Sequence, residues 1–131
     1  GARIIDDSYH ASAESMAAGL DLLCSLICDG SRMAILGEMG EMGDEAARMH
    51  ELVGAYAAAK KLDMLVCVGG ELAALMADSA RMMGMDEDRI QVFADYQQVL
   101  DRMGGALEKD DVVLVKGSRF VELDRFVEGV C

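Results

Sequence analysis

The chain has 131 residues and 53% of them are apolar, which allows one domain with a hydrophobic core and argues against disorder. The formal charge of −12 argues against non-specific binding of nucleic acid or anionic membrane. No apolar run approaches the roughly 18 residues that span a bilayer. Because no basic-then-apolar leader opens the chain either, a cytoplasmic protein is expected.

The chain opens with a strand-like run, residues 3–7, which leads into a helix-like run over residues 12–28. Apolar side chains recur every three or four residues in the second run, and Ser12 is placed to cap its start. Gly30 suits a left-handed cap at its end. A second expected strand covers residues 32–36.

The same alternation continues to the end of the chain. Further expected elements are a helix over 44–61, a strand over 64–68, a helix over 71–83, a strand over 90–93, a helix over 95–107, a strand over 111–115 and a helix over 121–127. Asp44 and Asp95 are expected caps. Five β-α units with short connections predict one domain, residues 1–131. Its expected fold is a Rossmann-like three-layer α/β sandwich, with a mostly parallel sheet and helices on both faces.

The four cysteines are Cys24, Cys28, Cys67 and Cys131, and they form no CxxC motif. Cys24 and Cys28 would share a face of the first expected helix, and a zinc site with Cys67 is one interpretation. The favoured interpretation is buried small hydrophobic residues and one C-terminal thiol, so no metal site is predicted.

In a parallel sheet all strand-exit loops lie along one edge, and this edge is the default ligand site. The first such loop, residues 6–12, carries two carboxylates, a hydroxyl, a phenol and an imidazole. These groups could face a ligand. Alternatively, Asp6 and Asp7 form a turn and Ser12 only caps the helix.

The exit loop of the last expected strand, Lys116-Gly117-Ser118-Arg119, is the most informative. Its lysine and arginine can hold a carboxylate or phosphate, and its glycine lets the backbone approach a ligand. A solvated cationic turn that pairs with Glu122 is the alternative. The functional interpretation is favoured, because two of only twelve cations fall at one strand exit.

Other exits are less decisive. In the loop over residues 38–43, Glu38 and Glu41 could bind a cation or an amine, or the loop could be merely acidic and mobile. Neither GxxxxGK[ST] nor GxGxxG occurs. Gly69-Gly70 could cradle an anion or allow tight packing. His50 is expected to be a surface or half-buried histidine rather than a catalyst.

Three blocks of the chain match a known signature. Residues 6–16 resemble DDSYNANPDSM, residues 34–43 with His50 and Gly54 resemble A-x-L-G-D-M-x-E-L-G…H…G, and residues 114–119 match L-V-K-G-S-R. In these blocks, which span nearly the whole chain, the sequence resembles the C-terminal domain of the Mur ligase family. The match is closest to its MurF branch, the UDP-N-acetylmuramoyl-tripeptide–D-alanyl-D-alanine ligases.

The resemblance implies an ATP- and magnesium-dependent ligase that adds D-alanyl-D-alanine to UDP-MurNAc-tripeptide through an acyl phosphate. Such ligases have three domains, and this chain resembles only the third. The N-terminal and central ATPase domains, which would hold most of the ATP and Mg²⁺, have no counterpart here. They are therefore expected partners, and the chain alone is expected to be inactive, with no catalytic residue of its own.

Carried over by position, the resemblance implies that the first loop lies beside the nucleotide. Asp7 would accept ribose hydroxyls, and Tyr9 would lie beside the nucleotide or the acyl phosphate. The implied nucleotide contacts are Asp7, Ser8, Tyr9 and His10. The implied contacts to the amino substrate or the domain interface are Ser12, Glu38, Lys116, Gly117, Ser118 and Arg119.

The sequence departs from the family pattern at two places. N-A-N-P is replaced by His10-Ala11-Ser12-Ala13, and G-D-M by Gly37-Glu38-Met39. Two other functions stay open. One is a stand-alone Rossmann-like or flavodoxin-like binding module, although a receiver domain would need an acidic residue where Gly69-Gly70 stands. The other is a sister Mur-type ligase with another amino substrate.

Overall fold

The computed structural model describes residues 2–8 and 11–131. Its strands are β1 (Arg3–Asp7), β2 (Arg32–Gly37), β3 (Met64–Val68), β4 (Ile90–Phe93) and β5 (Val112–Lys116). Its α-helices are α1 (Ala13–Ser25), α2 (Ala46–Ala58), α3 (Glu71–Met82), α4 (Tyr96–Met103) and α5 (Leu123–Val130). Three 3₁₀ turns, η1 (Gly43–Glu45), η2 (Glu87–Arg89) and η3 (Arg119–Val121), complete the described elements.

The strands form one sheet in the order β1-β5-β2-β3-β4, and every neighbouring pair is parallel. The register aligns the ends of the first, fifth and second strands, because Lys116 lies opposite both Asp7 and Leu36. The exit loops of β1, β5 and β2 therefore begin side by side at one edge.

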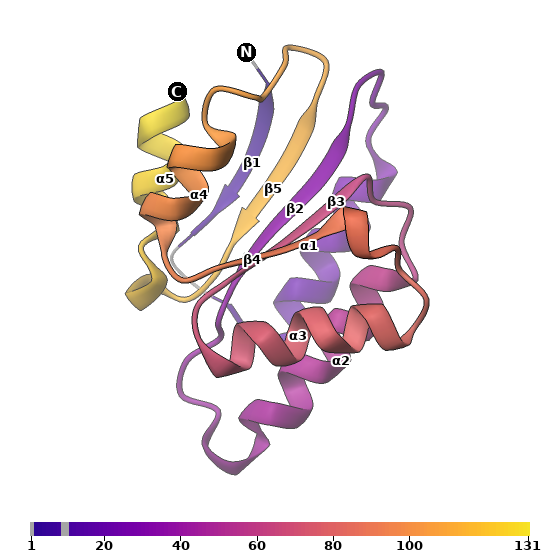
Figure 1. Ribbon diagram of the computed structural model, residues 1–131, viewed down its shortest axis with the longest axis vertical. Helices are drawn as coiled ribbons and strands as arrows, with labels where there is room; N and C mark the ends of the chain where they lie inside the picture. The colour runs from indigo at the N-terminus through magenta and orange to yellow at the C-terminus, as the bar shows by residue number, and fades with distance from the viewer. Residues whose placement is uncertain (1, 9–10) are drawn as a thin grey trace.

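Helices cover both faces of the sheet, as Figure 1 shows, with α1, α2 and α3 on one side and α4 and α5 on the other. Successive side chains of a strand point to opposite faces. In β5, Leu114 accordingly packs with the first three helices, whereas Val113 and Val115 pack with α4 and α5. The unbroken apolar strands are explained by burial on both faces. The predicted three-layer α/β sandwich is confirmed.

Several predicted helix boundaries are wrong. The first helix ends at Ser25, because Leu26 is already extended, so Cys28 lies beyond the helix and Gly30 does not cap it. The second helix is preceded by η1, and Asp44 lies inside that turn instead of capping α2. Ser12 and Asp95 are confirmed as side-chain caps.

Candidate functional site

The exit of β1 places Asp7 and Ser8 at the edge where the strands end. The Asp7 side chain is 50% exposed, whereas Ser8 is fully buried. The Ser8 N–H donates to Asp6 Oδ1 at 3.2 Å, so Asp6 forms the turn that leaves the strand. Within residues 2–8 and 11–131, the Oγ atom of Ser8 has no hydrogen-bond partner. The expected nucleotide contacts Tyr9 and His10 lie outside the described residues.

Ser12 serves the start of α1. Its Oγ accepts the N–H of Ser15 at 3.1 Å, and Ser15 Oγ accepts the N–H of Ser12 at 2.8 Å. A reciprocal cap of this kind satisfies two backbone donors that a helix start leaves without intrahelical partners. The structure thus accounts for Ser12 by capping, and it gives no separate support for the expected substrate contact.

Lys116 is the buried cation of the edge. Its side chain is 2% exposed, and its Nζ forms an ion pair with Asp7 Oδ2. The burial of this lysine is at odds with the solvated cationic turn considered as the alternative. Glu122 pairs with Arg125. The pair joins the exit loops of β5 and β1. A buried ammonium needs such a partner because losing its hydration is costly.

Glu38 is the residue that connects β2 to α3. Its carboxylate accepts the N–H groups of Gly70 at 3.0 Å and Ala73 at 3.1 Å, at the positive end of the helix. Gly69 has φ +144°, and a Cβ there would lie 2.5 Å from Glu38 Cδ. The Gly69-Gly70 turn therefore does hold an anion, but the anion is the protein's own carboxylate. Glu38 thus caps a helix, and its expected contact to substrate stays a prediction.

His50 is fully buried, so the prediction of a surface or half-buried histidine is wrong. Its Nε2 accepts the N–H of Met39 at 2.9 Å, and its Nδ1 lies 2.7 Å from the carbonyl oxygen of Ala46. The histidine thus joins α2 to the exit loop of β2. Sequence reasoning missed this because the partner is a backbone group eleven residues away.

Hydrogen bonds connect the exit loop of β5 to the exit loop of β2. Ser118 Oγ accepts the N–H of Gly40 at 2.7 Å, and the N–H of Ser118 donates to the carbonyl oxygen of Glu38 at 3.1 Å. Gly117 lies so close to Gly37 that a Cβ at position 117 would be 3.0 Å from the Gly37 Cα. Gly117 thus permits this close approach of the two loops. Arg119, the last residue of the predicted block, is exposed and begins η3.

A hollow of about 380 Å³ lies at this edge, between the exits of β2, β3, β4 and β5. Its lining includes Glu38, Gly70, Asp95, Tyr96, Phe120 and Glu122. Phe120 is 61% exposed, although a phenylalanine is normally buried. Sequence reasoning missed Tyr96 and Phe120. The signal for Phe120 was its position directly after the cationic block.

A second hollow, of about 260 Å³, lies between α1 and the strands β1 and β5. Asp7 and Lys116 line it together with apolar side chains of the strands and small residues of α1. Gly19 keeps α1 close to β5, because a Cβ there would lie 3.3 Å from side-chain atoms of Leu114 and Lys116. The Asp7–Lys116 pair therefore borders a mainly apolar space.

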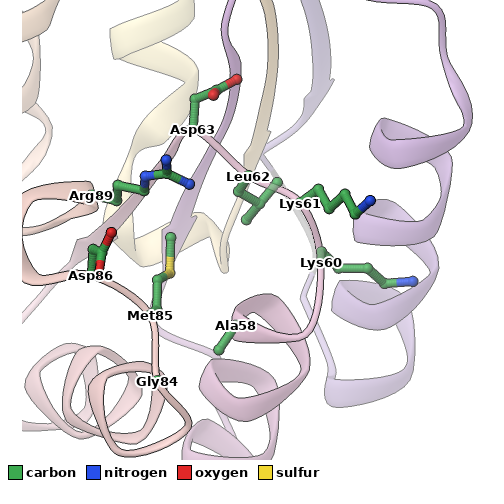
Figure 2. A pocket seen from close by; sticks show the side chains of 9 residues that line it. All are labelled: Ala58, Lys60, Lys61, Leu62, Asp63, Gly84, Met85, Asp86 and Arg89. Carbon is green, nitrogen blue, oxygen red and sulfur yellow. The ribbon is translucent and has the colours of Figure 1, made fainter.

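The hollow in Figure 2 belongs to the opposite edge, before the starts of β3 and β4. Lys60 and Lys61 line it, but Figure 2 shows their ammonium groups directed away from its centre. Lys60 instead pairs with Asp21 at 2.5 Å. This hollow is thus separate from the ligand edge.

Neither a membrane-spanning helix nor a metal-binding cluster occurs in the described part of the chain. No helix there combines the length and apolar character that a membrane crossing requires. Residues 2–8 and 11–131 also contain no group of three or more His, Cys, Asp or Glu side chains arranged to hold a metal ion.

The fold and edge together define a class: an α/β domain whose strand exits carry acidic, hydroxyl and cationic groups next to two hollows. The family model described as "Mur ligase, glutamate ligase domain" matches residues 1–119. The chain therefore belongs to this family, that of the C-terminal domain of Mur ligases.

Curated relatives carry the name UDP-N-acetylmuramoyl-tripeptide–D-alanyl-D-alanine ligase. The Bacillus subtilis protein is 34% identical over 128 residues, which cover 98% of this chain and 28% of that protein. The Treponema pallidum protein is 36% identical over 121 residues, covering 91% of this chain and 25% of that protein. The chain thus spans about a quarter of the length of these relatives.

Solved structures agree with this assignment. A crystal structure of MurF from Acinetobacter baumannii superposes with a TM-score of 0.82 at 25% identity, covering 97% of this chain and 27% of that one. MurF from Thermotoga maritima in complex with ADP gives a TM-score of 0.74 at 26% identity, with coverages of 97% and 27%.

Proposed function

We propose that this chain is the third domain of a three-domain, ATP-dependent ligase that joins D-alanyl-D-alanine to UDP-MurNAc-tripeptide in the cytoplasm. The observation that carries the proposal is the convergence of the three signature blocks: Asp7 pairs with Lys116, and Gly40 donates to Ser118. The names of the relatives support the substrates. The N-terminal and central domains of the same ligase are the proposed partners.

The nucleotide side of the edge is proposed to lie at the exit of β1. The half-exposed Asp7 carboxylate, which pairs with Lys116, can accept hydrogen bonds from ribose hydroxyls. The apolar hollow beside this pair offers space for an uncharged part of the nucleotide. The neighbouring Ser8, Tyr9 and His10 remain proposed nucleotide contacts.

The amino-substrate side is proposed to lie at the exit of β5. Because Ser118 Oγ accepts the N–H of Gly40, its own proton can be donated to a carboxylate of D-alanyl-D-alanine. Arg119 can bind the same carboxylate in two-pronged fashion. Phe120 offers an exposed apolar surface next to the hollow. Lys116 would contribute positive charge from below the surface.

Magnesium is proposed to be bound together with ATP, because Mg²⁺ is usually held by one or two carboxylates plus substrate phosphates. ATP, when bound, supplies the phosphoryl group of the acyl phosphate. Both are proposed to be held mainly by the other two domains. The role proposed for this domain is therefore to close over the cleft and to bind and orient nucleotide and amino substrate.

Phosphate release tests this function. The complete gene product that contains this chain is expected to release phosphate only when ATP, UDP-MurNAc-tripeptide and D-alanyl-D-alanine are all present. The 131-residue chain alone is expected to release none. Release by the isolated chain, or a complete product without a G-x-x-G-K-[ST] segment upstream of Gly1, would favour a different function.

A further inference from the structure

The two hydrogen bonds of His50 determine which of its ring nitrogens donates and which accepts. The carbonyl oxygen of Ala46, 2.7 Å from Nδ1, can only accept, so Nδ1 carries the proton. The N–H of Met39, 2.9 Å from Nε2, can only donate, so Nε2 is unprotonated. The two contacts together assign one nitrogen as donor and the other as acceptor, so they select one tautomer of the imidazole.

The partner of His50 lies in the exit loop of β2, residues 38–43, which we call the β2 loop. Three successive residues of this loop are tied to three different elements. The Glu38 carboxylate caps α3, the N–H of Met39 binds His50 of α2, and the N–H of Gly40 binds Ser118 beyond β5. His50 accepts the second of these three contacts, the hydrogen bond from Met39.

The hydrogen bond between Met39 and His50 also affects the orientation of Ser118. Met39 is followed directly by Gly40, whose N–H occupies a lone pair of Ser118 Oγ. The position of the Gly40 N–H therefore limits where the Ser118 hydroxyl can send its own proton. His50 itself is 0% exposed and lies out of reach of any ligand at the edge.

We propose that His50 is a positioning residue for the amino substrate: by accepting the Met39 N–H it holds the β2 loop so that Ser118 is oriented toward that substrate. The inference rests on the function proposed above, but its structural half can be measured without activity.

The first experiment is nitrogen NMR on the 131-residue chain near neutral pH. Wild-type His50 is expected to show a protonated Nδ1 and an unprotonated Nε2, with the Met39 amide protected from exchange. A charged imidazole, an Nε2–H tautomer or an unprotected Met39 amide would overturn the proposal. These measurements on the wild type test the hydrogen bond between His50 and Met39 even if a variant fails to fold.

Two variants then test the tie. His50→Leu removes the acceptor, and the Met39 and Gly40 amides are expected to exchange about tenfold faster or more, as befits loss of one buried hydrogen bond. His50→Gln keeps an acceptor on a polar side chain and is expected to restore much of the protection. Equal protection in the wild type and His50→Leu would contradict the tie.

The second experiment measures the intact ligase. In His50→Leu, KM for D-alanyl-D-alanine is expected to rise about tenfold while KM for ATP stays within about twofold, and His50→Gln is expected to be intermediate. Equal rises in both KM values, or a fall in kcat alone, would overturn the positioning role. If the wild-type ligase ignores D-alanyl-D-alanine, the proposed function fails, whereas the NMR result still decides whether His50 holds the loop.

Discussion

Asp7 and Lys116 form an asymmetric pair. The carboxylate is half exposed and can be rehydrated if its partner is lost, whereas the ammonium is buried and cannot. Removing one partner of a buried pair is costly chiefly when it leaves the other charge without hydration. The two residues should therefore respond very differently to substitution.

We expect Asp7→Asn to destabilise the chain more than Lys116→Met does. The first change leaves a buried ammonium without its carboxylate, which should cost about 2 kcal/mol or more. The second removes the buried charge and keeps an apolar side chain, so we expect a cost below about 1.5 kcal/mol. Urea unfolding of both variants measures the difference, and a larger loss in Lys116→Met would contradict the burial of Lys116.

Cys67 gives the fold a dependence on alkaline pH. Burial raises the pKa of its thiol from 9.0 to about 12. Above pH 9 the unfolded chain releases this proton and the folded chain keeps it, so the stabilisation is complete below that pH. It is then lost as the pH rises toward 12, by about 1.4 kcal/mol per pH unit.

The matched variant is Cys67→Ala, which lacks the thiol. Under reducing conditions between about pH 9 and pH 11, the free energy of unfolding should fall more steeply with pH in the wild type than in Cys67→Ala. The variant should be less stable near pH 7, because it leaves a small cavity. Parallel slopes in the two proteins would show that the thiol does not titrate as described.

At the scale of single residues, the sequence indicated which side chains gather at the edge but not how they are used. Because Lys116 follows a fully apolar run, the sequence predicts that it lies at the end of a strand. The sequence does not predict whether its side chain is buried or solvated. His50 has a backbone partner, and such a partner leaves no mark in the residue pattern. Local signals succeed where the partner is near in sequence, as with Ser12 and Ser15.

At the scale of the elements, glycines allow neighbouring segments to pack closely. Gly69 adopts φ +144° beneath the Glu38 side chain that caps α3. Gly54 of α2 lies against α3, where a Cβ would be 2.1 Å from the carbonyl oxygen of Met76. At both positions a methyl group would clash with a neighbouring element. The absence of a side chain therefore sets how closely these elements approach each other.

Glu38 and Gly69 should show coupled effects. Glu38→Ala removes a helix cap and should cost about 1 kcal/mol. Gly69→Ala should cost more, because it introduces both backbone strain and a clash with Glu38. In the double variant the clash is gone, so the total loss should be smaller than the sum by about 1 kcal/mol. Strict additivity in unfolding experiments would argue against the contact.

Gly54→Ala tests the packing of α2 on α3. Alanine normally stabilises a helix interior by about 0.5–1 kcal/mol relative to glycine. Here the clash with a backbone carbonyl should reverse the sign and cost about 2 kcal/mol or more. Gly105→Ala is the control, since nothing lies within 4 Å of its Cβ position, and its effect should stay within about 0.5 kcal/mol. A stabilised Gly54→Ala protein would refute the close approach of α2 and α3.

Element type was predictable from the sequence, whereas several boundaries were not. The apolar strands and periodic helices follow from burial, which the residue pattern records. The early end of α1 at Ser25 is accompanied by contacts to residues distant in sequence. Cys28, for example, contacts the carbonyl oxygens of Ser31 and Asp110 instead of continuing the helix.

At the scale of the whole molecule, the parallel sheet explains why three separate sequence blocks lie together at one edge. The order β1-β5-β2 makes the exits of the first, last and second strands neighbours, although they are far apart in the chain. The structure thus brings the three blocks to the edge where the strand exits were expected to converge. The packing of the helices around this edge depends on His50, Gly54 and Gly69. The three blocks did not reveal these contacts.

The central claim is that this edge binds the nucleotide and the amino substrate of a ligase. Its most direct test is the steady-state kinetics of the complete gene product with Asp7→Asn, assayed as folded protein. Loss of a charged acceptor for ribose hydroxyls should raise KM for ATP about tenfold or more and leave KM for D-alanyl-D-alanine within about twofold. An unchanged KM for ATP, or no phosphate release that depends on D-alanyl-D-alanine in the wild type, would contradict the account.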